Sequence, residues 1–253
     1  MPPLLHEHVL VTGAAGAIGT AVCRELILRG HCVRGFDLRE PSPSIDGLDD
    51  MQVGNLADAD AVERAVAGMD AVAHLAAYPD EADFLDDLLE PNVIGVYHLL
   101  EATRRHQVRR VIVTSSCQTV EGHDWNERCL SVDEPFAPLG HYAVTKAMAE
   151  AWARYYAQQH GMSMIVVRPG MCPRDRSQWE WLMQDELKQR VYLSHTDAGR
   201  FYALCVEVPD VRFALLYGYS RCEEPYPFDP EPARTLLGYE PVAPWSGVPD
   251  GVL

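Results

Sequence analysis

Short runs of apolar, mostly β-branched residues recur along the first two thirds of the chain, with segments of helical length between them. The runs are VLVT (9–12), CVRGF (32–36), MQV (51–53), AVAHL (71–75), RVIVTS (110–115) and SMIVVR (163–168). Few of them alternate apolar and polar positions, as a strand with one face in water would. Near-continuous apolar strands are typical of a parallel sheet that helices cover on both faces. The pattern therefore predicts an α/β fold with a doubly wound parallel sheet.

Capping residues mark the ends of the intervening helices. The predicted helices are 17–29, 58–67, 84–106 and 141–160. Asp58 suits the N-cap of the second helix, while Gly30 and Gly161 suit the C-terminal ends of the first and last. Pro91 is expected to bend or interrupt the third helix, because proline has no amide hydrogen to donate.

The pattern becomes irregular after Arg168, where proline is frequent. The elements predicted there are a helix at 197–207, a strand near 212–217 and a short helix at 231–237. We expect residues 1–168 to form a Rossmann-type core and residues 169–253 a small lobe that closes over a site, with its strand returning to the core.

Composition limits the partners of this chain. The 253 residues include 21 basic and 37 acidic side chains, a formal net charge of −16 that repels nucleic acid and anionic lipid, so the expected ligand is a small molecule. The seven cysteines form no Cys-x-x-Cys pair, and no spacing of His, Asp or Glu suggests a metal site. No apolar stretch approaches the ~20 residues of a membrane span. We expect a soluble cytoplasmic protein without metal.

A glycine cluster joins the first strand to the first helix. Gly13 suits a tight turn, Gly16 lets a pyrophosphate approach the backbone, and Gly19 lets the helix pack closely on the strand. Asp37 ends the second strand, where its carboxylate can accept hydrogen bonds from ribose hydroxyls and would repel the 2′-phosphate of NADP. The loop therefore predicts a dinucleotide site for NAD, although Arg39 would suit the 2′-phosphate.

Tyr142 and Lys146 lie one helical turn apart, so both side chains project from one face of the helix. The chain has 11 tyrosines but only two lysines, which makes this spacing improbable by chance. An ammonium close to a phenol lowers the pKa of the phenol, and we expect Tyr142 to exchange a proton with a substrate hydroxyl.

Together these motifs resemble the extended short-chain dehydrogenase/reductase family of NAD-dependent epimerases and dehydratases. Further segments that match in order are NLAD (55–58), HLAA (74–77), NVIGVYHLLEA (92–102), SSCQTVEG (115–122), VVRPG (166–170) and LLGYEP (236–241). The resemblance implies a homodimer or higher homo-oligomer, Tyr142 as general acid/base, and Lys146 binding the nicotinamide ribose. The residues that it implies for the cofactor are Gly13, Gly16, Ala17, Ile18, Gly19, Asp37, Asn55, Leu56, Leu75, Ala76, Ala77, Asn92 and Lys146.

The resemblance gives two candidates for the residue that orients the substrate oxygen. The common pattern of the family places Cys117 there, whereas the pattern of uronate dehydrogenases places Ser116 there. Ser116 is favoured because a thiol is a weak hydrogen-bond donor. Gln118 is a further candidate for substrate contact.

Only 85 residues follow Arg168, which leaves little room for the domain that holds a nucleotide in nucleotide-sugar epimerases. The short lobe and the LSHTDAGRF segment (193–201) are most similar to uronate dehydrogenases, which oxidise a free sugar acid with NAD. Arg174 and Arg176 are candidates for binding a substrate carboxylate, with ordinary surface charge as the alternative. Two other functions stay open: an epimerase or dehydratase that retains NAD, and a non-catalytic dinucleotide sensor.

Overall fold

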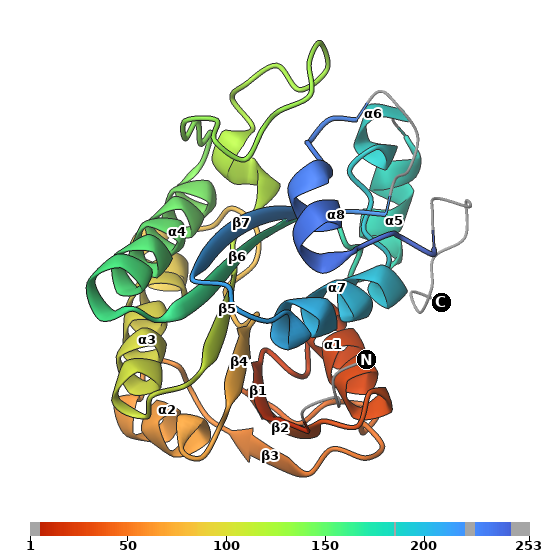
Figure 1. Ribbon diagram of the computed structural model, residues 1–253. Helices are drawn as coiled ribbons and strands as arrows, with labels where there is room; N and C mark the ends of the chain where they lie inside the picture. The colour runs from red at the N-terminus through yellow and green to blue at the C-terminus, as the bar shows by residue number, and fades with distance from the viewer. Residues whose placement is uncertain (1–5, 185, 221–225, 244–253) are drawn as a thin grey trace.

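The computed structural model describes residues 6–184, 186–220 and 226–243. Within these residues one parallel sheet has the order β3-β2-β1-β4-β5-β6-β7 (Figure 1). The strands are β1 (His8–Thr12), β2 (Cys32–Asp37), β3 (Asp50–Val53), β4 (Ala71–His74), β5 (Arg110–Thr114), β6 (Ser163–Pro169) and β7 (Phe213–Gly218). The strand order reverses between β1 and β4, which is where sheets of this type form a ligand crevice beyond the carboxyl ends of the strands.

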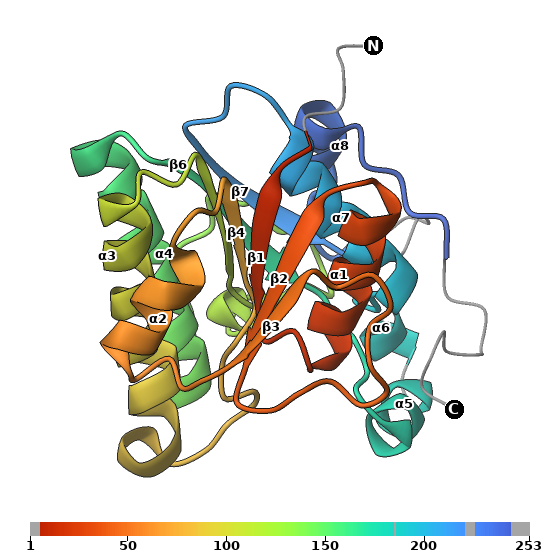
Figure 2. The ribbon, with the colours of Figure 1, turned by 90° about the horizontal axis from the view of Figure 1, so that it is seen from below.

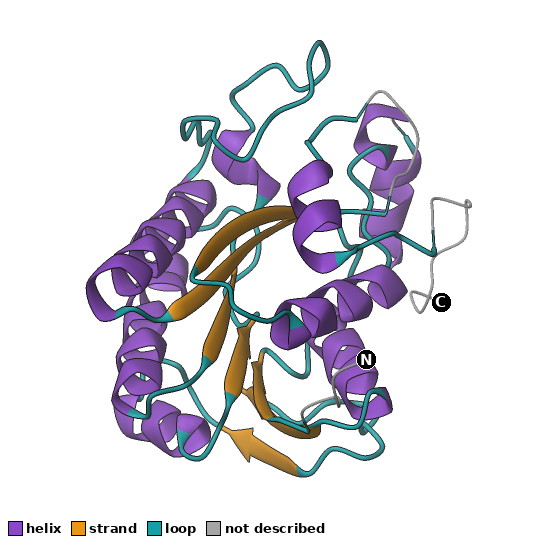
Figure 3. Ribbon diagram, viewed as in Figure 1, coloured by secondary structure: helices purple, strands orange, loops and turns teal. Residues whose placement is uncertain are grey.

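Helices cover both faces of the sheet, as the apolar strands require (Figures 2 and 3). One face carries α2 (Ala59–Val66), α3 (Gly95–Arg105) and α4 (His141–His160), and the other carries α1 (Ala17–Leu28), α7 (His195–Glu207) and α8 (Glu231–Leu237). Each helical layer buries its own apolar cluster against the strands. The predicted doubly wound α/β fold is confirmed.

The predicted helix ends are confirmed where a cap marks them. Asp58 accepts hydrogen bonds from the amides of Asp60 and Ala61 at the start of α2. Gly30 and Gly161 have φ of +89° and +68°, a left-handed conformation that favours glycine.

The segment predicted as a helix over 84–106 is continuous but not uniform. Two widened π-type turns, η1 (Phe84–Leu88) and η2 (Glu90–Ile94), precede α3. Pro91 lies in the first turn of η2, so the regular α-helical pattern is broken near this residue, as predicted, although the helical backbone continues.

The region after Arg168 contains more regular structure than we predicted. The helices at 195–207 and 231–237 and the strand β7 are present, but α5 (Arg176–Met183) and α6 (Glu186–Gln189) occupy a stretch expected to be irregular. Asp175 caps α5 by accepting from the amide of Gln178. Since β7 completes the sheet and α7 packs on α1, the segments left to close over the site are α5, α6 and their flanking loops. None of the described helices combines the length and apolar character that a membrane span needs.

Candidate active site

A cleft of about 680 Å³ lies beyond the carboxyl ends of the central strands. The loops after β1, β2, β4 and β5, the start of α4, and the α5–α6 region all contribute to its walls. The predicted site residues that line it are Gly13, Gly16, Ala17, Ile18, Gly19, Asp37, Asn55, Leu56, Leu75, Ala76, Ala77, Ser116, Cys117, Gln118, Tyr142, Lys146 and Arg174. The fold therefore gathers residues from seven separate stretches of sequence into one cavity.

The glycine loop has the close approaches that the sequence predicted. Gly13 has φ of +73°, and a Cβ atom built there would lie 2.8 Å from the amide nitrogen of Ala76. A Cβ on Gly19 would lie 1.9 Å from the carbonyl oxygen of Gly13. Gly16 caps α1, whose first turn carries no acidic side chain among its described residues. The backbone amides at this helix terminus suit the negative charge of a pyrophosphate.

The ends of β2 and β3 provide groups for an adenosine. The carboxylate of Asp37 accepts from the amide of Ala15 at 3.0 Å through Oδ2, which ties the end of β2 to the glycine loop. Asn55 accepts from the amide of Ala57 at 3.0 Å through Oδ1, and it lines the same end of the cleft. A carboxylate beside a glycine cradle is the donor and acceptor set that NAD requires. The residues present fit the dinucleotide.

The turn after β4 is fixed by a buried polar pair. Thr12 Oγ1 and His74 Nδ1 are 2.8 Å apart, and the amide of Ala76 donates to Thr12 Oγ1 at 3.2 Å. Burial, and then the charge of Lys146, lowers the pKa of His74 to about 3, so this histidine is neutral at physiological pH. His74 therefore supports the turn rather than transferring protons.

Asn92 lies behind the cleft and is not among its lining residues. Its side chain is 2% exposed, accepts from the amide of Tyr78 at 2.8 Å and donates to Thr145 Oγ1 at 3.2 Å. It joins the loop after β4 to α4. The resemblance implies a cofactor contact for Asn92, but the geometry suits support of the local hydrogen-bond network and not direct contact with a cofactor.

Tyr142 and Lys146 face the same space, as their spacing predicted. The Lys146 ammonium lies 5.6 Å from the centroid of the Tyr142 ring and donates to the carbonyl of Thr114 at 3.1 Å. Burial lowers the pKa of Lys146 to about 8.

The pKa of Tyr142 moves in the direction opposite to our expectation. Burial raises it above its usual value, and the carboxylate of Asp80 raises it further. Arg174 and a hydrogen bond with Ser116 act in the lowering direction but do not overcome these effects. The prediction considered only the ammonium of Lys146, whereas desolvation of the phenolate and a nearby carboxylate dominate in the folded protein.

Ser116 and Cys117 differ in where their side chains point. The Ser116 hydroxyl faces Tyr142, whose pKa it acts to lower, and accepts from the amide of Gln118 at 3.2 Å. The Cys117 thiol donates to the carbonyl of Pro169 at 2.9 Å, and burial raises its pKa to about 12. The geometry therefore favours Ser116 as the residue that orients a substrate oxygen.

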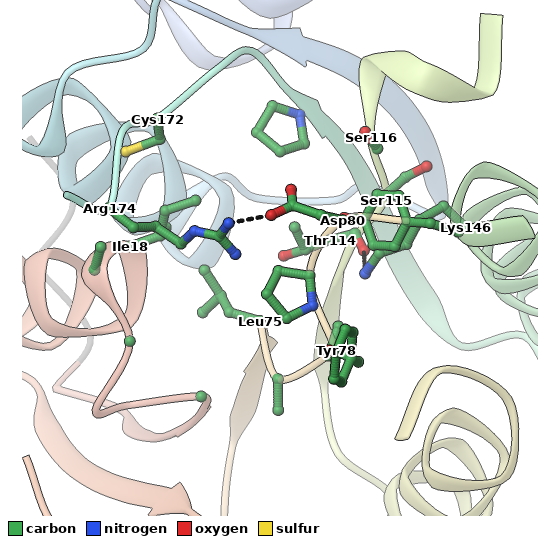
Figure 4. Close-up of a pocket in the computed structure, with 18 of the residues that line it drawn as sticks. Ile18, Leu75, Tyr78, Asp80, Thr114, Ser115, Ser116, Lys146, Cys172 and Arg174 are labelled. Carbon is green, nitrogen blue, oxygen red and sulfur yellow. Dashed lines mark hydrogen bonds and ion pairs between the residues drawn. The ribbon is translucent and has the colours of Figure 1, made fainter. Parts of the chain in front are cut away.

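The two candidate arginines lie in different environments. Arg174 reaches into the cleft and forms an ion pair with Asp80 (Figure 4). The side chain of Gln178 accepts from the backbone amide of Arg174 at 2.9 Å. Arg176 is 77% exposed, pairs with Glu180 at 3.0 Å and does not line the cleft. For Arg176 the alternative of surface charge fits, because the start of α5 turns this side chain toward solvent.

Several residues of the cleft were missed by the sequence analysis. They are mainly Tyr78, Asp80, Thr114, Ser115, Trp125, Trp181, Lys188 and Phe228. Thr114 and Ser115 are the last two residues of the strand predicted at 110–115, so the sequence already indicated their place at the carboxyl end of a strand. Trp125 and Phe228 are brought together only by tertiary folding, with ring centroids 6.3 Å apart.

Comparison with known proteins agrees with this geometry. A model of the NAD dependent epimerase/dehydratase family matches residues 9–172. A uronate dehydrogenase of Pseudomonas syringae pv. tomato is 32% identical over 214 residues, which cover 85% of this chain and 74% of that protein. The NAD-dependent glucose-6-phosphate dehydrogenase of Haloferax volcanii is 28% identical over 257 residues, which cover 94% of both chains.

Solved structures show the same likeness. The crystal structure of uronate dehydrogenase from Agrobacterium tumefaciens superposes with a TM-score of 0.81 at 28% identity, covering 94% of this chain and 85% of that one. A mutant of that enzyme was solved in complex with NAD, and it superposes equally well, with a TM-score of 0.81. These matches agree with the glycine cradle and the Tyr142–Lys146 pair. The chain belongs to the NAD dependent epimerase/dehydratase family and is an NAD-dependent enzyme.

Proposed function

We propose that this enzyme oxidises a hydroxyl group of a small sugar or sugar acid with NAD, in the manner of a uronate dehydrogenase. The observation that carries the proposal is the joint placement of Ser116, Tyr142 and Lys146 in the cleft that contains the glycine cradle. The relatives named above are dehydrogenases of a sugar acid and of a sugar phosphate, and an L-arabinose 1-dehydrogenase of Haloferax volcanii is 29% identical over 196 residues. Their common chemistry is the dehydrogenation of a sugar.

The proposed reaction moves a hydride and a proton from one hydroxyl-bearing carbon. Bound NAD supplies the acceptor for the hydride, which is the electron pair of the broken C–H bond. The phenolate form of Tyr142, whose fraction rises only at higher pH because the pKa is raised, takes the hydroxyl proton, and a C=O bond forms at that carbon. Ser116 hydrogen-bonds the substrate oxygen, and the ammonium of Lys146 stabilises the phenolate and holds the nicotinamide ribose. For the anomeric hydroxyl of a pyranose, the product is a lactone.

Lys146 has the charge that this role needs. Because its pKa is about 8, a large fraction of Lys146 is protonated at neutral pH. Its hydrogen bond to Thr114 fixes the ammonium at the carboxyl end of β5, close to Ser116. Proton transfer and cofactor binding are thereby coupled through one buried cation.

Of the two arginines predicted to bind the carboxylate of a sugar acid, only Arg174 lines the cleft, while Arg176 does not fit. A guanidinium can bind a carboxylate through two parallel hydrogen bonds. Arg174 is already paired with Asp80, so a substrate carboxylate has to replace Asp80 or share the guanidinium with it.

Turnover with a panel of sugars tests the proposal. The enzyme is mixed with NAD and galacturonate, glucuronate, glucose 6-phosphate or arabinose, and NADH formation is followed by absorbance. We expect Tyr142→Phe to lower kcat by about 10²- to 10⁴-fold while NAD binding, measured by calorimetry, stays unchanged. Tyr155→Phe is the matched control, because Tyr155 lies on the same helix and is 46% exposed.

Three results would contradict the proposal. Full turnover by Tyr142→Phe would remove the tyrosine from the chemistry. Conversion of a sugar without accumulation of NADH would indicate an epimerase or dehydratase that retains the cofactor. Binding of NAD without turnover of any sugar would favour a dinucleotide sensor.

We also propose that the chain forms a homodimer through α3 and α4. These neighbouring helices leave Tyr97, Met148 and Tyr155 between 37% and 46% exposed, which is unusual for three large side chains on one helical layer. Tyr155→Glu should shift the molecular mass in solution from dimer to monomer, measured by light scattering, and a monomeric parent protein would contradict this proposal.

A further inference from the structure

Aromatic side chains from segments outside the dinucleotide motifs form part of the lining of the cleft, and we call this part the aromatic wall. Trp125, Trp181 and Phe228 line it together with Lys188. Phe228 stacks on Tyr217 with ring centroids 4.6 Å apart and an interplanar angle of 18°, and Trp125 stacks on Phe228 at 23°. Trp125 and Phe228 thus give the cleft an apolar aromatic lining, which suits the apolar face of a sugar ring.

Lys188 is the cation that this wall presents to the cleft. Its ammonium lies 3.8 Å from the ring centroid of Trp181, and the side chain is half-buried. Among the residues that the structure describes, no carboxylate pairs with it. The face of an indole attracts an ammonium, but the ammonium keeps its net charge and its N–H donors. Lys188 can therefore donate to an anionic group in the cleft.

The other two cations of the cleft are already engaged. The Lys146 ammonium donates to the carbonyl of Thr114 and belongs to the catalytic group. The Arg174 guanidinium is paired with the carboxylate of Asp80 and also donates to Gln178 Oε1 at 3.3 Å. An anion that binds Arg174 must compete with the carboxylate of Asp80, whereas an anion that binds Lys188 displaces no carboxylate of the described residues.

We propose that Lys188 recognises the anionic group, carboxylate or phosphate, of an acidic sugar whose ring lies against the aromatic wall and whose reacting hydroxyl faces Tyr142. This inference deepens the proposed function and rests on it. Glu121 also lines the cleft, and its carboxylate suits the hydroxyl groups of the same substrate. Lys188 determines the class of substrate and takes no part in proton transfer.

Steady-state kinetics of Lys188→Gln test the proposal. The matched control is Arg176→Gln, which removes a cation from the same region but from outside the cleft. The substrates are galacturonate for the carboxylate, glucose 6-phosphate for the phosphate, and galactose and glucose as their neutral counterparts.

We expect Lys188→Gln to raise KM for the acidic sugars by roughly 10- to 100-fold, as loss of a hydrogen bond to a charged group does, with kcat nearly unchanged. KM for the neutral sugars should not change, Lys188→Arg should retain much of the affinity, and Arg176→Gln should behave as the parent. Of galacturonate and glucose 6-phosphate, the substrate whose KM rises more identifies whether Lys188 binds a carboxylate or a phosphate. An unchanged KM for both acidic sugars, or an equal rise for neutral sugars, would overturn the inference.

A binding measurement separates this inference from the proposed function. Because Trp181 lies under the ammonium, its fluorescence reports on ligands of Lys188. Titration of the NAD-bound enzyme with inorganic phosphate or with gluconate should give a saturable change in the parent and in Arg176→Gln, but not in Lys188→Gln. If no sugar is oxidised but this pattern is found, only the proposed reaction fails. If sugars are oxidised and the titrations of all three proteins are alike, only the role of Lys188 fails.

Discussion

The buried ion pair between Glu150 of α4 and Arg168 of β6 predicts a large loss of stability when its carboxylate is replaced. Arg168 donates to both carboxylate oxygens, at 2.8 and 2.9 Å, and the two side chains are only 2% and 4% exposed. Ser115 adds a hydrogen bond of 2.5 Å to the same carboxylate. Glu150→Gln leaves the guanidinium buried without a negative partner, with the Tyr217 hydroxyl still accepting from it at 2.9 Å.

Removing one member of a buried pair costs about 3 to 5 kcal/mol. In a chain of this length each kcal/mol lowers Tm by roughly 2 to 4 °C, so the expected fall in Tm is at least about 6 °C. Urea unfolding followed by tryptophan fluorescence measures the free energy of unfolding directly. The control is Arg105→Gln, which breaks an exposed pair with Glu63 and should cost less than about 1 kcal/mol. A loss below about 1 kcal/mol for Glu150→Gln would refute the reasoning.

Three further predictions concern the cleft. Asp37→Ala should weaken NAD binding by roughly 10- to 100-fold and reduce the preference for NAD over NADP, measured by calorimetry with each dinucleotide; unchanged affinities would contradict the assigned ribose contact. Gly19→Ala should weaken NAD binding and lower Tm, because its Cβ would lie 1.9 Å from the carbonyl oxygen of Gly13, and a variant that binds NAD like the parent would contradict the close approach. Asp80→Asn removes a charge that, after burial, raises the pKa of Tyr142, so the increase of kcat/KM with pH should move to lower pH, and a shift to higher pH would contradict the assignment.

The fold could be predicted where the pattern is local and both faces of an element are buried. The apolar runs at 9–12 and 163–168 lie within β1 and β6, because strands covered on both sides have no competing polar pattern. The helix α5 was missed because its formation depends on distant contacts. Trp179 and Leu182 are buried in a cluster with Tyr192, and a helix of this length is marginal without such packing.

In the candidate site too, features that depend on neighbouring residues in the sequence could be predicted, whereas features that depend on distant residues could not. The glycine loop and the Tyr142–Lys146 spacing are contained in single elements, so sequence alone placed them in one cleft. The pKa of Tyr142 could not be predicted because it depends on burial and on Asp80, which is 62 residues away in the chain. The exposure of Arg176 depends in turn on where α5 begins, which the sequence analysis did not predict.

The charge of the chain determines how the cleft can attract its ligands. A net charge of −16 repels both a dinucleotide and an acidic sugar at long range, so electrostatic steering does not favour their approach. The attraction must therefore arise at contact, from the backbone amides at the start of α1 and from local cations. The two lysines of the chain, Lys146 and Lys188, both line the cleft. Contacts made only after approach mainly determine how slowly a ligand leaves, and we therefore expect substitutions of Asp37 and Lys188 to change dissociation rates far more than association rates.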